Sequence, residues 1–387
     1  MHLGLPTAAQ GRRWPTSLRL VTAVGLCIVT ACTGAPASPT APTVAATATA
    51  QPTPVPAASA TPVVDLGAEI DGVLTSLAEQ GFLSGAVLVA RDGEVLLSKG
   101  YGLADRENNV PNSEETIFRI TGVTAPFTAM ALVILEEDGL LDLESPLCDF
   151  VPDCPADWQP VTLHHLLTST SGIPEDINDW VPTMATPTPV EEMLPRIQDA
   201  PLLFEPGEQF SYSLWDYYLL GIVIEQVSGQ SYGDFLRERI FEPLGMTHTS
   251  YGPVSADWAI GYANAFTRAD VMDPSIGFAA AGIVSTVEDL YRWDQALYDE
   301  PLVSQATLDR IFSGQNPYGV TPNWDFGWKF TEIEGRAAVQ NIGYIPGFIG
   351  HITRFPDDHV TVISLFNQED VDLNFVTGVI FDKLFAP

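Results

Sequence analysis

Apolar positions in this chain repeat with two different periods, which predict helices and strands in different segments. From residue 66 onward the apolar residues fall at helical spacing, at Leu66, Ile70, Val73, Leu74 and Leu77. Two apolar runs, 86–90 and 95–97, then flank the dipeptide Asp92-Gly93, which favours a tight hairpin turn. This part of the pattern predicts a helix followed by two antiparallel strands.

The remaining pattern places helices in the middle of the chain and strands near its end. Residues 126–140 predict a helix, and the segments after it are mostly helical or loop-like. Four strand-like runs follow, at residues 326–330, 337–341, 348–355 and 360–366, before an apolar helix over about 373–384. We therefore expect strands from both ends of one folded domain, residues 65–387, with helices between them.

Residues 1–32 have the pattern of a bacterial lipoprotein export signal. Basic residues precede an apolar run over residues 20–29 that is too short to span a bilayer. The tetrapeptide Val-Thr-Ala-Cys ending at Cys32 resembles a lipobox, so we expect lipid-modified Cys32 to begin the mature protein. A signal cut at another bond, or a short membrane anchor, is the alternative.

Residues 33–64 contain no charged residue and consist almost only of Pro, Thr, Ala, Ser, Gly, Val and Gln. Such a segment cannot bury a core and favours extended conformations, so it predicts a linker of up to ~90 Å at about 3 Å per residue. We expect an extracytoplasmic protein that meets the bacterial membrane only through its N-terminal lipid anchor.

The cysteines agree with that compartment. If Cys27 leaves with the signal and Cys32 carries lipid, Cys148 and Cys154 remain, close together in one predicted loop. Outside the cytoplasm such a pair favours a disulfide, and it lacks the additional Cys or His spacing of a metal site. The sequence implies neither a metal nor a cofactor.

The chain is also strongly acidic. Its 387 residues are 46% hydrophobic and 17% charged, which suits a large folded body, but 49 acidic against 17 basic residues give a net charge of -32. Such a surface repels phosphate backbones, so we do not expect a nucleic-acid partner. Solubility or a salty habitat explains the charge most simply.

The segment 119–129 reads RITGVTAPFTA and carries the most specific chemical information. It resembles R-I-G-S-V-T-K-P-F-T-A, the nucleophile segment of the β-lactamase-related serine hydrolases, which include penicillin-binding proteins. The resemblance places the catalytic serine at Gly122 and its lysine at Ala125. In the S-x-x-K motif, a lysine one helical turn after the serine activates its hydroxyl, and neither residue here has a side chain for that step.

Two further motifs of the same family have also changed. The Y-x-N element falls on Tyr212, Ser213 and Leu214, so the tyrosine is retained and the amide is replaced. The K-T-G or H-T-G element falls on Asn341, Ile342 and Gly343, and Tyr344 begins the following G-x-P-G-F element. Once the nucleophile is absent, buried polar groups around it become unfavourable, which explains a shift toward apolar residues.

The rest of the resemblance concerns the scaffold and covers nearly all of residues 66–384. Segments such as VTLHHLLTSTSGIP at 161–174 and AGIVSTVEDLYRWDQAL at 281–297 look like family scaffold. The resemblance implies the α+β β-lactamase, or penicillin-recognising, fold. In that fold an antiparallel sheet built from both chain ends is flanked by helices and joined to a mainly helical subdomain.

Other signals have simpler structural interpretations. Residues 229–233 satisfy G-x-S-x-G, but a helix precedes them where a nucleophile elbow needs a strand, so we expect Ser231 to cap the next helix. We expect structural roles for His164, His165 and His351. We also expect the hydroxyls of Thr121 and Thr124, which flank the lost serine, to satisfy backbone groups at the helix start.

Binding can outlast catalysis, because the oxyanion hole of this family consists of main-chain N–H groups. By resemblance its donors are the amides of Gly122 and Tyr344. The main hypothesis is an inactive family member, a pseudoenzyme, that binds a protein or a peptidoglycan-like ligand. The alternatives are an active esterase or D-amino-acid peptidase-like hydrolase that uses Tyr212, and a structural module whose cleft Tyr344 fills.

Overall fold

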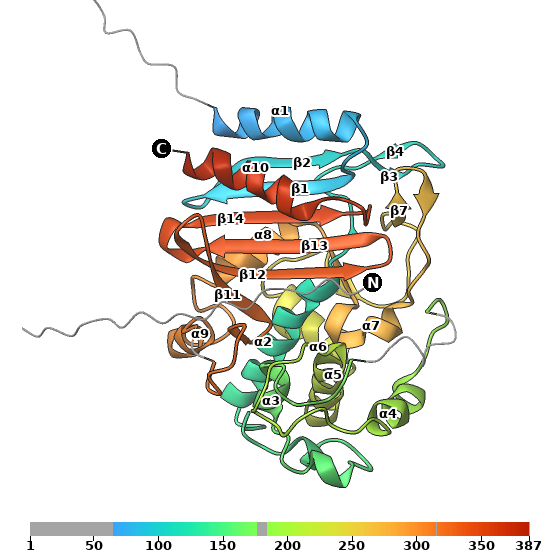
Figure 1. Cartoon of the computed structure of the whole chain (residues 1–387), viewed down its shortest axis with the longest axis vertical. Helices are drawn as coiled ribbons and strands as arrows, with labels where there is room; N and C mark the ends of the chain where they lie inside the picture. Colours follow the sequence, from blue (N-terminus) through green and yellow to red (C-terminus); the bar gives the residue numbers. More distant parts are fainter. Residues whose placement is uncertain (1–64, 176–183, 315, 387) are drawn as a thin grey trace, which may run out of the picture. The chain divides into compact units, whose positions relative to one another are not determined.

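The computed structural model describes residues 65–175, 184–314 and 316–386, so the expected signal, Cys32 and the linker lie outside the described residues. Its centre is a seven-stranded sheet of order β10-β11-β12-β13-β14-β1-β2, in which every neighbouring pair is antiparallel (Figure 1). The strands are β1 (Gly85–Arg91), β2 (Glu94–Tyr101), β10 (Trp324–Asp325), β11 (Trp328–Ile333), β12 (Arg336–Ile345), β13 (Phe348–Phe355) and β14 (Val360–Phe366).

The two ends of the domain meet inside this sheet. Strand β1 pairs with β14 from Gly85 opposite Phe366 to Arg91 opposite Val360. The predicted hairpin turn is present, with φ of 53° at Asp92 and 78° at Gly93, as a two-residue turn of this kind requires. The expectation of an antiparallel sheet built from both chain ends is therefore confirmed.

Helices cover both faces of the sheet and form a second region beside it. They are α1 (Leu66–Glu79), α2 (Thr124–Glu137), α3 (Leu163–Leu167), α4 (Val190–Gln198), α5 (Leu214–Ser228), α6 (Tyr232–Leu236), α7 (Pro274–Ala281), α8 (Val287–Ala296), α9 (Gln305–Ile311) and α10 (Leu373–Phe385). In Figure 1, α10 lies in front of the sheet and α8 behind it, while α2, α3, α5 and α6 gather below it. Buried apolar residues form one core under α1 and α10 and a larger one across the helical region.

The helix that carries the degenerate motif differs from its prediction at both ends. It was expected over 126–140 but begins at Thr124 and ends at Glu137. A short 3-10 turn, η1 (Thr121–Val123), precedes it. Pro126 lies in the first helical turn, where its missing N–H removes no helical hydrogen bond.

Short strands hold η1 against the large sheet. Strands β5 (Phe118–Arg119), β9 (Ile283–Ser285) and β6 (Ser250–Tyr251) form a small sheet in the order β5-β9-β6. Two short hairpins complete the strands, β3 (Leu103–Asp105) with β4 (Val110–Pro111) and β7 (Tyr262–Asn264) with β8 (Thr267–Arg268). Because β5 leads directly into η1, this pairing fixes where the degenerate motif meets β12 and β13.

Within the described part of the chain, no helix has both the length and the apolar character needed to cross a membrane. The same part of the chain brings no group of three or more His, Cys, Asp or Glu side chains into an arrangement that could hold a metal ion.

Candidate functional site

Gly122 occupies η1 and packs directly on strand β12. A Cβ atom at Gly122 would lie 3.1 Å from the Cα atom of Gly343 and 3.5 Å from Oδ1 of Asn341. The approach is closer still in the other direction, since a Cβ atom at Gly343 would lie 2.0 Å from the amide nitrogen of Gly122. The structure therefore brings the residues that align with the catalytic serine and with K-T-G together, although neither chemical group is present.

Asn341 takes the place of the family's cation and has a structural bond instead. Its side chain is buried, and Nδ2 donates to the backbone oxygen of Gly327 at 2.7 Å. Its Oδ1 has no hydrogen-bond partner in the described structure. Asn341 thus ties β12 to the turn between β10 and β11 and offers no positive charge to a ligand.

The positions of the lysine and the amide are apolar and buried. Ala125 is 2% exposed in the first turn of α2, and Leu214 is 8% exposed as the first residue of α5. Ser213 caps α5, where its hydroxyl accepts from the backbone N–H of Trp215. Neither Ala125 nor Leu214 has a side-chain group that can exchange a proton.

No lysine of the chain takes over the lost role. Lys99 pairs with Asp71 at 2.6 Å, and Lys383 pairs with Glu69 at 2.7 Å. The third lysine, Lys329, is exposed on β11 opposite Gln340, so strand alternation puts it on the other face from Asn341. A general base of the family's type is therefore absent from this part of the structure.

Tyr212 is the motif side chain that is retained, and 38% of its surface is exposed. Burial of its hydroxyl, together with the nearby carboxyls of Glu175 and Asp216, raises the pKa of Tyr212 well above its usual range. The phenol is consequently protonated at neutral pH. It can donate a hydrogen bond there but cannot act as a base.

Asp216 is a buried acid that the sequence interpretation missed. It lies on α5 with no exposed surface, and the hydroxyl of Ser171 donates to its Oδ1 at 2.5 Å. Burial raises the pKa of Asp216 well above its usual range, and the nearby Glu175 raises it further. Its signal was an acidic residue among the apolar residues that begin α5.

The two threonines that flank Gly122 are both buried, and neither hydroxyl bonds a backbone group at the helix start, as had been expected of both. Thr124 accepts a hydrogen bond from the backbone N–H of Ile283 on β9, so it satisfies a backbone group, although not one of its own helix. Thr121 has φ of 57°, and its Oγ1 has no partner among the described residues. Its hydroxyl is held against Gly343 and Gly350 and has no base beside it.

Tyr344 does not fill the cleft. It is 61% exposed, because residues alternate along β12 and the neighbouring Gly343 is the one that faces η1. The hypothesis of a structural module whose cleft is closed by Tyr344 is therefore wrong, because the side chain of Tyr344 points away from η1.

The other candidate side chains have structural partners. Ser231 caps α6 by accepting from the backbone N–H of Asp234. His165 forms a capping box with Thr162 at the start of α3, and His164 bonds Glu144 at 2.9 Å. Burial holds the pKa of His351 at about 3, far below its usual range, so this residue is neutral.

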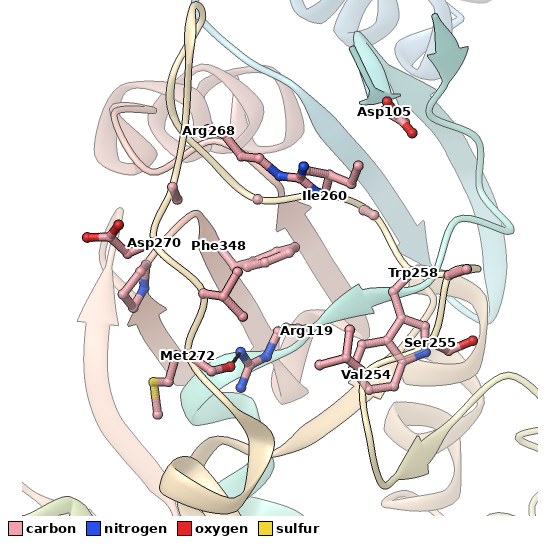
Figure 2. Close-up of a pocket in the computed structure, with 16 residues that line it drawn as sticks. Asp105, Arg119, Val254, Ser255, Trp258, Ile260, Arg268, Asp270, Met272 and Phe348 are labelled. Carbon is pink, nitrogen blue, oxygen red and sulfur yellow. Dashed lines mark hydrogen bonds between the residues drawn. The ribbon is translucent and has the colours of Figure 1, made fainter. Parts of the chain in front are cut away.

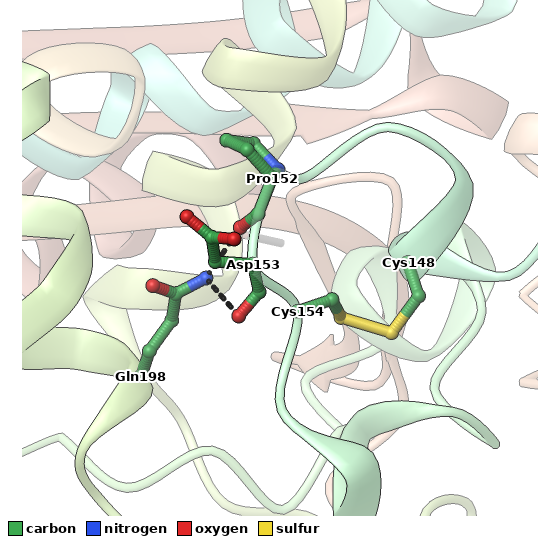
Figure 3. Close-up of a disulfide and its surroundings, with 5 residues drawn as sticks. All are labelled: Cys148, Pro152, Asp153, Cys154 and Gln198. Atoms are coloured by element: carbon green, nitrogen blue, oxygen red, sulfur yellow. Dashed lines mark hydrogen bonds between the residues drawn. A yellow bond between two sulfur atoms is a disulfide. The ribbon is translucent and has the colours of Figure 1, made fainter.

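Cys148 and Cys154 form a disulfide in the loop region before α3 (Figure 3). The intervening residues are tied to α4, because Nε2 of Gln198 donates to the backbone oxygen of Pro152 at 2.8 Å. This bridge closes a small loop away from Gly122 in the sequence and has no chemical role in the cleft.

These features define the class of protein. The family model described as "Beta-lactamase" matches residues 70–382, and the chain belongs to the β-lactamase family. It is 31% identical over 320 residues to penicillin-binding protein 4* of Bacillus subtilis (strain 168), and this match covers 76% of this chain and 70% of that protein. It is also 31% identical over 352 residues to protein flp of Staphylococcus aureus (strain NCTC 8325 / PS 47), and this match covers 80% of this chain and 71% of that protein.

Solved structures show the same architecture. The octameric penicillin-binding protein homologue from Pyrococcus abyssi is 28% identical with a TM-score of 0.71, over 82% of this chain and 77% of that chain. The D-amino acid amidase from Ochrobactrum anthropi SV3, complexed with D-phenylalanine, has a TM-score of 0.72, and the match covers 83% of this chain and 99% of that chain. Because the two chains are only 24% identical, this likeness shows the fold alone. The expected penicillin-recognising fold is confirmed.

Proposed function

We propose that this chain is a catalytically inactive member of the β-lactamase family that acts by binding. The observation that carries the proposal is the site at Gly122, which has neither a nucleophile nor a base. The hydroxyl and ammonium of the S-x-x-K motif are both absent, and the three lysines of the chain lie elsewhere. Since covalent catalysis needs both groups, removal of both leaves no residual acyl transfer of the usual kind.

The ligand we propose is a protein or a peptidoglycan-like molecule at the outer cell surface. The support is the close approach of β12 to η1 at Gly343. In this proposal the main-chain amides of Gly122 and Tyr344 are the hydrogen-bond donors. The N–H group of Gly122, in the 3-10 turn η1 that leads into α2, favours a carbonyl or carboxylate oxygen. The export signal and linker expected at residues 1–64 support a lipid-anchored extracytoplasmic location.

An active hydrolase that uses Tyr212 is the second candidate, favoured by the retention and partial exposure of this one motif side chain. Its raised pKa argues against it, because a protonated phenol cannot remove a proton from water at neutral pH. The relatives named as penicillin-binding proteins, and the fold neighbour named as an amidase, suit either candidate.

Ester turnover separates the two candidates. The purified protein is incubated with 4-nitrophenyl acetate beside its Tyr212→Phe variant, with Tyr291→Phe on α8 as a matched control and an active family enzyme as the positive control. We expect the wild type and both variants to release nitrophenol at one low rate. Turnover that Tyr212→Phe abolishes and Tyr291→Phe leaves intact establishes the active hydrolase instead.

Sedimentation with insoluble peptidoglycan tests the ligand class. We expect the wild-type protein to sediment with it and a Gly122→Phe variant, whose ring blocks the site, to remain in solution. If neither protein sediments, the peptidoglycan-like ligand is removed and a protein partner is left as the proposal. If both sediment equally, peptidoglycan binds outside the Gly122 site, which contradicts the proposal.

A further inference from the structure

A cavity lies beside β5, on the side of the small sheet where the loop before α7 passes. Its volume is about 420 Å³, within the range of ordinary small-molecule sites. Figure 2 shows Arg119 at its base between Met272 and Val254, with Phe348 above and Trp258 to one side. None of the positions Gly122, Ala125 and Leu214 lines this cavity, the Arg119 pocket, although Phe348 of the G-x-P-G-F element does.

Arg119 is a buried cation in which at least three of the five N–H donors have no partner among the described residues. Its side chain is 5% exposed, and Nη1 donates to the backbone oxygen of Met272. Nε and Nη2 have no partner, and no carboxylate of the described residues forms an ion pair with the guanidinium. Burial lowers the pKa of Arg119 to about 10, against an opposing effect of Asp273, so the group is charged at neutral pH.

The free atoms have a geometry that points to a particular chemical partner. Nε and Nη2 present parallel N–H groups along one edge of the planar guanidinium, which matches the two oxygens of a carboxylate. A buried charge without a counter-ion is unfavourable, so an anion that reaches this edge stabilises the folded protein. The two donors are buried in this structure, so an occupant must displace the side chains that cover them.

The walls of the pocket add an apolar and aromatic character. Trp258, Phe348 and Met272 line it, and Arg268 lies above Phe348 in Figure 2. Two carboxylates also line it, those of Asp105 and Asp270. Asp105 accepts hydrogen bonds from the backbone and side chain of Asn108, so it is already engaged away from Arg119.

We propose that the Arg119 pocket binds a monocarboxylate with an apolar or aromatic body, its two oxygens paired with the free edge of Arg119. A small aromatic acid and the C-terminal residue of a peptide share this chemistry. The apolar side chains that line the pocket select ligands by the shape of their apolar part. The buried guanidinium of Arg119 selects an acid over a neutral amide of the same size. This proposal does not depend on whether the family cleft is active.

Thermal unfolding of the full chain tests the proposal with paired probes. Phenylacetate is compared with phenylacetamide, and acetyl-Ala-Phe with its C-terminal amide, each at millimolar concentration. We expect the acids to raise Tm by about 2 °C or more and the amides to leave it unchanged. A response to phenylacetate alone identifies a small acid as the ligand type, and a larger response to the peptide acid identifies a peptide C-terminus. Equal effects of acid and amide overturn the proposal.

Variants locate the response. Arg119→Met should abolish the acid-dependent rise without lowering Tm of the free protein, because it removes an uncompensated buried charge. Ala256→Trp, which leaves Arg119 intact but narrows the pocket, should reduce the rise, and Arg239→Met on the distant helical surface should keep it. If Arg119→Met does not fold, Ala256→Trp decides: an acid response equal to that of the wild type overturns the proposal.

Discussion

Gly343 of β12 lies so close to Gly122 of η1 that a Cβ atom added to Gly343 would be 2.0 Å from the Gly122 amide nitrogen. The framework that once brought a serine to its strand is thus intact after the serine has gone. Strand β12 and η1 thus meet at two glycines, as close packing of their backbones requires. This contact supports the proposal that the chain acts by binding.

The same contact predicts an ordered series of glycine variants. Gly343→Ala places a methyl group against the η1 backbone, where no flexible side chain can yield, and we expect it to lower the free energy of unfolding by about 1–3 kcal/mol or more. Gly122→Ala meets its nearest atom at 3.1 Å and should cost less. Gly378→Ala on α10 has open space and should be neutral or slightly stabilising. Urea unfolding of the three variants checks the order, and equal losses contradict it.

Restoring the lost motif should require two residues. Gly122→Ser alone should not react with a penicillin, because no lysine stands near the new hydroxyl. Gly122→Ser combined with Ala125→Lys should react slowly, since Leu214 and Asn341 still lack the family's polar groups. We also expect the double variant to lose a few kcal/mol of stability from burying an ammonium at a position only 2% exposed. Intact mass over time distinguishes the variants, and acylation of the single variant contradicts this account.

The neutral, buried His351 predicts a loss of stability in acid. Its pKa is about 3 in the folded protein and its ordinary value is 6.5, so protons bind preferentially to the unfolded chain between these values. The contribution of His351 is complete above pH 6.5 and falls by about 1.4 kcal/mol per pH unit as pH drops toward 3. We expect urea unfolding of His351→Leu to lack this component between pH 7 and 4, whereas the exposed control His248→Leu keeps it. Parallel curves for wild type and His351→Leu contradict the prediction.

The disulfide makes a separate contribution to stability. Cys148 and Cys154 are 6 positions apart, and in the loop-entropy account a loop this short is worth about 2 kcal/mol. Replacing both cysteines by serine should lower the free energy of unfolding by that amount and leave ligand binding unchanged. Urea unfolding measures the first, and the phenylacetate response of Tm measures the second. An unchanged free energy of unfolding contradicts the structural role.

Much of the fold was predictable from local pattern. The helix at 66–77, the hairpin at Asp92-Gly93, the strands from β11 to β14 and the last helix all follow from spacing that a single segment contains. The segment before α2 was not predictable in this way, because Thr121 takes a left-handed conformation and packs against Gly343 and Gly350, which are distant in sequence. Local pattern is silent about such contacts between distant segments.

The site was predictable in its residues and less so in its geometry. The motif positions Gly122 and Gly343 do come together. The bond from Asn341 to Gly327 and the burial of Asp216 depend on tertiary neighbours that the sequence does not place. The outward direction of Tyr344 was available in principle from strand alternation beside an inward Gly343. The sequence contains one indication of the role of Arg119, since it is a cation within the apolar, strand-like run Phe-Arg-Ile. The comparison with the family motif includes this arginine but does not explain it.

Intact-mass measurement of the wild-type protein after incubation with excess benzylpenicillin tests the central claim most directly. With an active family enzyme acylated in parallel, the account predicts an unchanged mass for this chain, because no nucleophile and base meet at Gly122. A mass increase equal to the penicillin, mapped by peptide analysis to Thr121 or any other residue of the cleft, would contradict it and make this chain a catalytically competent hydrolase.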